Sequence, residues 1–252
     1  MTAALPMTTL VVVVGMMVMM MMMTTTTGLT FNKVRLITTA PNGNMLFRSD
    51  YPGNANGTFA LDLLLEYMER RAEEAGVHWP PSPPYVVDVT LLNEPHNRKE
   101  IAEEERFFAA HPSAGEVVYM STHGSITNPM DFPPDVRDTI ADGLDFDSFD
   151  RLPERIPAIH KLLTQDSPTP RVVLLHCIAG DDRTGEVAGS YVMKYLGAPS
   201  FEDVLYWDDR IAHGSNTSFI LLHHAYAMEW YCFWLQQHEG MALTCEYDWP
   251  RK

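Results

Sequence analysis

The residues best suited to chemistry are a cysteine and an arginine six positions apart, Cys177 and Arg183, in the stretch HCIAGDDRTG at 176–185. An unbroken apolar run at 172–175 precedes this stretch, and a helical pattern follows it from Thr184, so the residues predict a strand, a short loop and a helix. The backbone N–H groups of such a loop can turn inward, beside the partial positive charge of the helix N-terminus. The spacing therefore predicts a phosphate-binding loop.

The residue types within the loop fit phosphoryl transfer. The helix terminus and Arg183 favour the thiolate form of Cys177, which is the form that attacks phosphorus. Arg183 can donate two hydrogen bonds to phosphoryl oxygens, and Thr184 can hydrogen-bond the sulfur when it leaves. Gly180 lets the backbone approach a ligand without a Cβ. The predicted phosphate-binding residues are Ile178, Ala179, Gly180, Asp181, Asp182 and Arg183.

The segment resembles the phosphate-binding loop of the cysteine-based protein tyrosine phosphatase superfamily, with its C-x5-R-[ST] pattern. The resemblance implies two-step hydrolysis of a phosphomonoester through a cysteinyl-phosphate on Cys177. The Asp-Arg-Thr ending is similar to the branch with bacterial lipid-and-tyrosine phosphatases and myotubularin-type phosphatases. The sequence FRSDYP at 47–52 is similar to the F-R-S-x-x-P segment near the start of many such domains.

The general acid stays open between two sets of aspartates. In some of these relatives the residue before the motif arginine protonates the leaving oxygen, which indicates Asp182 here. Most tyrosine phosphatases instead carry the acid on a loop about thirty residues before the cysteine. The candidates on that loop are Asp145, Asp147 and, farther away, Asp131.

The substrate is predicted to be a phosphotyrosine protein or a small phosphomonoester. Many lipid-and-tyrosine members carry Lys where this chain has Asp181, which weakens the case for a phosphoinositide or inositol phosphate. A catalytically inactive phosphate-binding module is a further alternative, and a sulfur-transfer enzyme is another. Arg48 is interpreted as a structural partner of a carboxylate, and His176 as a residue that orients the loop by hydrogen bonding.

Apolar runs alternate with helical patterns along the chain, which predicts an α/β fold with a mostly parallel central sheet flanked by helices. Strands are expected at 45–47, 86–92, 117–120 and 172–175. Other expectations are a helix near 61–68, a helix opened by a capping box of Asn97 and Glu100, a long loop over 121–150, a helix near 152–163 that starts late because of its prolines, and a helical C-terminal third. No linker divides residues 29–252, so one phosphatase-like domain is expected.

The composition restricts the partners. A net charge of −15 opposes nucleic acid as a partner, because the general field repels polyanions. No cofactor is expected. No metal is expected either, since the adjacent pairs His223-His224 and Asp208-Asp209 would point to different faces of their helices.

The N-terminus bears on the compartment. The uncharged apolar run at 10–23 predicts that residues 1–28 are a signal peptide, a signal anchor or a disordered leader. A signal would place the protein in the secretory pathway or at a membrane, anchored only through 10–23, whereas a disordered leader would leave it cytoplasmic. If the chain enters the secretory pathway, the sequons at 56–58 and 216–218 would be glycosylation acceptors. Their simpler interpretations are a turn and a helix N-cap, respectively. Cys232 and Cys245 could form a disulfide, or Cys232 could be ordinary core.

Overall fold

The computed structural model describes residues 31–54, 56–212 and 219–249. The chain divides into Met1–Thr30 and Phe31–Lys252, and the described residues all belong to the second unit. The predicted leader at 1–28 and the sequon at 216–218 therefore lie outside them. No helix in the described ranges is long and apolar enough to cross a membrane. A single domain over 29–252 stays a prediction.

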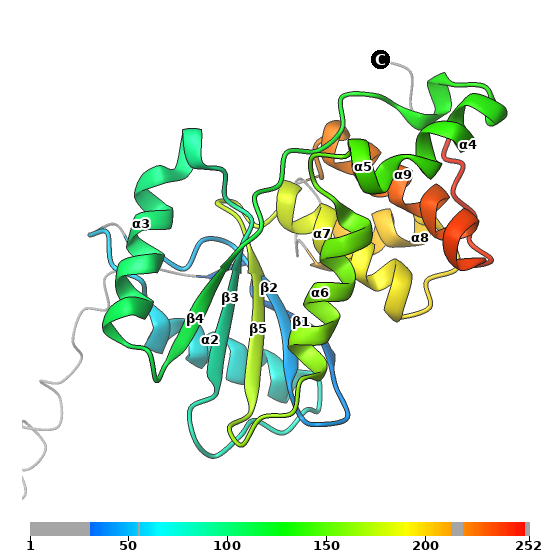
Figure 1. Cartoon of the computed structure of the whole chain (residues 1–252). Coiled ribbons are helices and arrows are strands. Elements are labelled where there is room, and N and C mark those ends of the chain that lie inside the picture. The colour runs from blue at the N-terminus through cyan, green and yellow to red at the C-terminus, as the bar shows by residue number, and fades with distance from the viewer. Residues whose placement is uncertain (1–30, 55, 213–218, 250–252) are drawn as a thin grey trace, which may run out of the picture. The chain divides into compact units, whose positions relative to one another are not determined.

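A five-stranded sheet lies in the middle of this unit, in the order β1-β2-β5-β3-β4 (Figure 1). Only β1 is antiparallel to its neighbour, and the other pairs are parallel. The strands are β1 (Arg35–Thr39), β2 (Met45–Ser49), β3 (Tyr85–Thr90), β4 (Gly115–Tyr119) and β5 (Arg171–His176). The four expected strands are present, and the α/β prediction is confirmed. Strand β1 escaped prediction because it is a half-buried edge strand without an apolar run.

Helices flank the sheet and fill the C-terminal third of the described chain. They are α2 (Leu61–Glu74), α3 (Glu94–Ala110), η1 (Pro129–Asp131), α4 (Pro134–Asp142), α5 (Leu144–Asp147), α6 (Leu152–Thr164), α7 (Asp182–Tyr195), α8 (Phe201–Tyr206), the π-helical η2 (Trp207–Ala212) and α9 (Leu222–Glu239). Helix α9 is buried along most of its length, as expected of a core helix. It packs on α7 and α4.

Alternate side chains of the central strand serve two cores. Val173 and Leu175 of β5 pack with residues of α6, α7 and α9 in one cluster. Val172 and Leu174 point to the opposite face of the sheet, where α2 and α3 lie (Figure 1). All four are fully buried, which explains the unbroken apolar run of this strand.

Two expectations about the segment between β4 and β5 are wrong. The predicted loop over 121–150 contains η1, α4 and α5, and helix α6 begins at Leu152 rather than late. Pro134 and Pro153 lie in the first turns of α4 and α6. Proline is well tolerated there because the first turn leaves its N–H groups without helical partners. These prolines mark helix starts instead of helix breaks.

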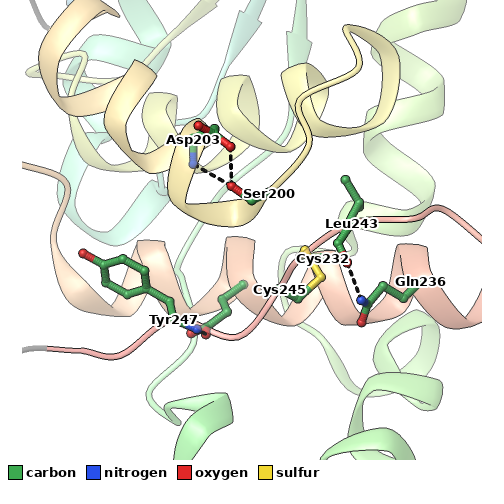
Figure 2. The surroundings of a disulfide bond; sticks show 8 residues. Ser200, Asp203, Cys232, Gln236, Leu243, Cys245 and Tyr247 are labelled. Carbon is green, nitrogen blue, oxygen red and sulfur yellow. Dashed lines mark hydrogen bonds between the residues drawn. A yellow bond between two sulfur atoms is a disulfide. The ribbon is translucent and has the colours of Figure 1, made fainter.

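The C-terminal segment is tied along α9 by a disulfide and hydrogen bonds (Figure 2). Cys232 of α9 is bonded to Cys245, and Gln236 Nε2 donates to the Leu243 carbonyl over 2.6 Å. Glu229, one turn before Cys232, accepts from Trp249 Nε1 over 2.8 Å. Burial raises the pKa of Glu229 to about 7, against the effect of this hydrogen bond. The three contacts step along α9 and hold the segment 241–249 against the helix.

Removing the disulfide is expected to destabilise the protein by about 3 kcal/mol, since the bond closes a loop between two residues 13 positions apart in the unfolded chain. The measurement is urea unfolding of the Cys232→Ser/Cys245→Ser double variant. The matched control is Cys177→Ser, which removes the free thiol and leaves the bridge intact. Equal midpoints for the double variant and the wild type would show that the bridge contributes nothing.

Candidate active site

The loop 177–181 lies at the carboxyl end of β5, where α7 begins at Asp182. In open α/β sheets, ligands bind at this edge. Cys177 at the start of the loop is only 2% exposed. The neighbouring strand β2 ends beside it, since Ser49 is in register with His176. Four of the predicted site residues, Cys177, Asp182, Arg183 and Thr184, thus sit at one junction of strand, loop and helix.

Two loop carbonyls are held by the segment that follows β2. The Ile178 carbonyl accepts from the N–H of Tyr51 over 3.0 Å, and the Gly180 carbonyl accepts from Arg48 Nη2 over 2.6 Å. The described chain has no cis peptide bond, and in a trans peptide the N–H points opposite to the C=O. The N–H groups of Ala179 and Asp181 therefore point away from β2. The segment FRSDYP at 47–52 therefore orients the N–H groups of Ala179 and Asp181 away from β2 through its contacts with the two carbonyls.

Arg48 is fully buried and acts as a brace for the loop. Its other nitrogen, Nη1, pairs with the carboxylate of Asp208 in η2, which is fully buried too. One guanidinium thus joins β2, the loop and η2, which is the structural role interpreted for it. A guanidinium suits this place because its two terminal nitrogens can donate to the Asp208 carboxylate and the Gly180 carbonyl at the same time.

Gly180 is required by its backbone conformation and by the space around it. Its φ is +73°, a region that side chains rarely adopt. A Cβ at this position would lie 2.8 Å from the backbone N of Asp50 and from the Ser49 carbonyl oxygen. The glycine therefore lets the loop close directly onto the end of β2.

Arg183 is positioned by Asn97 of α3, the residue that the capping-box pattern places at a helix start. Its Nη1 donates to Asn97 Oδ1 over 2.9 Å. Asn97 lies at a kink where two helical stretches of α3 meet, with φ −123° and ψ 26°, so a helical stretch begins after it as expected, although α3 as a whole begins earlier, at Glu94. The kink turns the amide toward the loop. No local sequence signal indicated this contact, because Asn97 is 86 positions from Arg183.

Asp182 and Asp181 each make a tertiary contact. Asp182 Oδ1 accepts from the N–H of Leu221 over 2.8 Å, which ties the first turn of α7 to the start of α9. Asp181 pairs with Lys33, which precedes β1. A cation therefore stands at the rim beside Asp181, although the sequence had indicated an acidic rim there. This contact too spans far more residues than a sequence motif.

Other predicted residues are placed as follows. Asp131 and Asp145 are exposed on η1 and α5, elements that contact α9, and make no hydrogen bond or ion pair with the loop. Asp147 ends α5, and its side chain lies outside the described part. The hydroxyl of Thr184 is buried and makes no hydrogen bond. Asn56 of the first sequon is exposed in a turn.

Asp50 is a site-proximal carboxyl that the sequence analysis did not single out. Its backbone N lies against Gly180. Burial raises the pKa of Asp50 to about 6, against the influence of Lys33. A carboxyl with this pKa exchanges a proton close to neutral pH.

Comparison with known proteins does not assign the site to a class. No protein-family model and no curated protein matches the chain. Among solved structures, P. aeruginosa TpbA is similar at 15% identity, with a TM-score of 0.38, over 75% of this chain and 84% of TpbA. TpbA in complex with pTyr is similar at 14% identity with the same TM-score, over 75% of this chain and 83% of that one.

Proposed function

We propose that this chain is a cysteine-dependent phosphatase, similar to protein tyrosine phosphatases, that hydrolyses phosphomonoesters through a cysteinyl-phosphate on Cys177. The observation that supports it most is the pair of loop carbonyls held by Tyr51 and Arg48. Because their peptides turn N–H groups the other way, the loop offers fixed donors to an anion beside the N-terminus of α7. A nucleophile at the start of that loop is suited to attack a bound phosphoryl group.

The proposed reaction has two steps. In the first, Cys177 Sγ as the thiolate attacks phosphorus, the bond from phosphorus to the ester oxygen breaks, and Asp182 gives a proton to the leaving oxygen. In the second, water attacks the cysteinyl-phosphate with Asp182 taking its proton, and the products are phosphate and the free thiolate. Arg183, held by Asn97, neutralises charge on the phosphoryl oxygens in both steps. The buried hydroxyl of Thr184 hydrogen-bonds the departing sulfur in the second.

The proposed substrate is a phosphotyrosine side chain or a similar aryl phosphate. The charges of Lys33 and Asp181 offset one another at the rim, and Arg48 is committed to Asp208 and Gly180. An inositide with several phosphates would need additional cations near the loop.

Hydrolysis of an aryl phosphate by the full chain tests this function directly. Steady release of phosphate that vanadate inhibits supports the phosphatase. Stoichiometric vanadate binding by the folded chain without any turnover would instead identify an inactive phosphate-binding protein. Phosphoinositides hydrolysed far faster than phosphotyrosine peptides would overturn the proposed substrate.

Asp182→Asn is expected to lower turnover of a phosphotyrosine peptide by about 10²–10³-fold, because a carboxamide cannot protonate the leaving oxygen. The amide oxygen can still accept from Leu221, so the fold is retained. The loss should shrink for 4-nitrophenyl phosphate, whose leaving group departs without help, when kcat is compared across leaving groups.

The matched controls are Asp131→Asn and Asp145→Asn on the segment before β5, and Asp50→Asn beside the loop. Each is expected to retain the leaving-group dependence of the wild type. If the loss of turnover depends on the leaving group in one of these variants, and not in Asp182→Asn, that aspartate is the general acid instead of Asp182.

A further inference from the structure

A buried cluster of three ionisable side chains includes His176, the residue before the predicted nucleophile Cys177. His176 Nε2 is 3.0 Å from Asp88 Oδ1 of β3 and 3.4 Å from Glu104 Oε1 of α3. All three side chains are 0% exposed. His176 is bonded in sequence to Cys177, so this cluster adjoins the site without reaching solvent.

The sheet register explains why these side chains meet. Asp88 is in register with Leu174, and Thr90 with His176, so all four belong to the sheet face that α3 covers. Glu104 reaches the same place from α3. The side chains of Asp88 and Glu104 are fully buried, and the His176 ring lies beside both carboxyl groups. A buried carboxylate is stabilised by a cation nearby.

The other ring nitrogen of His176 also faces an acceptor. Nδ1 lies 3.3 Å from the carbonyl oxygen of Cys177. A neutral imidazole has only one N–H and can serve only one of these sides, whereas an imidazolium has a donor for each. Acceptors on both sides of the ring therefore favour the charged form.

The electrostatics of the cluster agree with this geometry. Burial by itself would lower the pKa of His176, but Asp88 and Glu104 outweigh it and raise the pKa to about 9. Burial, with Asp88 adding to it, raises the pKa of Glu104 to about 8. Asp50 and the ring of Tyr51, from the segment after β2, also face His176, and Glu100 of α3 acts electrostatically on Glu104.

We propose that Asp88 and Glu104 are positioning residues that keep His176, the residue before Cys177, positively charged and so favour the thiolate of the nucleophile. The proposal rests on the function proposed for Cys177. The two carboxyl groups act through the histidine. A negative charge near Cys177 would by itself disfavour the thiolate, whereas the positive charge of a protonated His176 favours it.

The sign of the effect tests the proposal. Cys177 is the single thiol outside the disulfide, so its alkylation by iodoacetamide can be followed in the full chain without any phosphate chemistry. The Asp88→Asn/Glu104→Gln variant is expected to raise the pH of half-maximal alkylation by about one unit or more, which is the effect of losing a unit charge nearby. In a His176→Asn background, the same two changes are expected to lower that pH or leave it unchanged. Glu105→Gln, an exposed neighbour on α3, is the matched control and should have no effect.

Nitrogen NMR of the wild-type imidazole rings provides a measurement that needs no variant to fold, apart from His176→Asn for assignment. The His176 ring is expected to carry two N–H protons at pH 7. A neutral ring, a midpoint that falls in the carboxylate variant, or one equivalent of bound metal in the purified chain would overturn the proposal. If the alkylation shift appears without any phosphatase turnover, the proposed function fails, but the roles of Asp88 and Glu104 are supported. Phosphatase turnover without the shift would support the function and overturn those roles.

Discussion

Cys177→Ser is expected to reduce hydrolysis of aryl phosphates by about 10⁴-fold or more. Serine is too weak a nucleophile at neutral pH without a base to activate it, and loss of a covalent nucleophile removes most of the chemical step. Oγ replaces Sγ at a side chain that is 2% exposed, so the change in volume is small. The measurement is kcat with 4-nitrophenyl phosphate, together with thermal unfolding to show that the fold is kept.

The serine variant should still bind an anion, which separates chemistry from recognition. The carbonyl contacts of Ile178 and Gly180 are made by Tyr51 and Arg48 and do not involve the sulfur. A phosphotyrosine peptide titrated into the inactive variant is therefore expected to saturate. Residual turnover near that of the wild type would contradict the cysteinyl-phosphate mechanism, whereas lost binding with the fold intact would contradict the anion-binding loop.

Arg48→Met is expected to lower the free energy of unfolding by about 3–5 kcal/mol, the usual result of removing one member of a buried ion pair. The substitution leaves the Asp208 carboxylate buried without the guanidinium that faces it, and it removes the donor to the Gly180 carbonyl. Arg48→Lys keeps the charge but cannot fork to both acceptors, so an intermediate loss is expected. Denaturant unfolding measures both.

The matched control for this prediction is Arg35→Met on β1, whose Cα is in register with Arg48 but whose side chain is half-buried. A change of about 1 kcal/mol or less is expected there. A double-mutant cycle with Asp208→Asn should show strong coupling to Arg48. Additive losses would mean that the two residues stabilise the fold separately and that the ion pair is not the brace.

The sequence by itself determined the parts of this protein that depend on neighbouring residues. The apolar run of β5, the C-x5-R spacing and the helical pattern after it predict a strand, loop and helix, and the structure has them at Arg171–His176 and from Asp182 onward. The inner strands β2, β3 and β5 were predictable because buried strands are rich in apolar residues, and the half-buried edge strand β4 was predictable from its short apolar run at 117–120. Proline misled the predictions over 121–150 and 152–163: Pro134 and Pro153 fall in the first turn of a helix, where proline is tolerated, and α6 also continues through Pro157.

Only the tertiary structure decided what surrounds the loop. Asn97 reaches Arg183, Lys33 reaches Asp181, and Glu104 reaches His176 across separations of 72 to 148 residues. Each of these side chains is an ordinary polar residue in its own helix or loop, and no local pattern marks it as part of the site. What brings them to the site is the strand order β2-β5-β3 and the kink in α3. Contacts of this kind are set by the packing of the whole sheet, so the sequence indicates the proposed nucleophile but not the polar and charged side chains that pack around its loop.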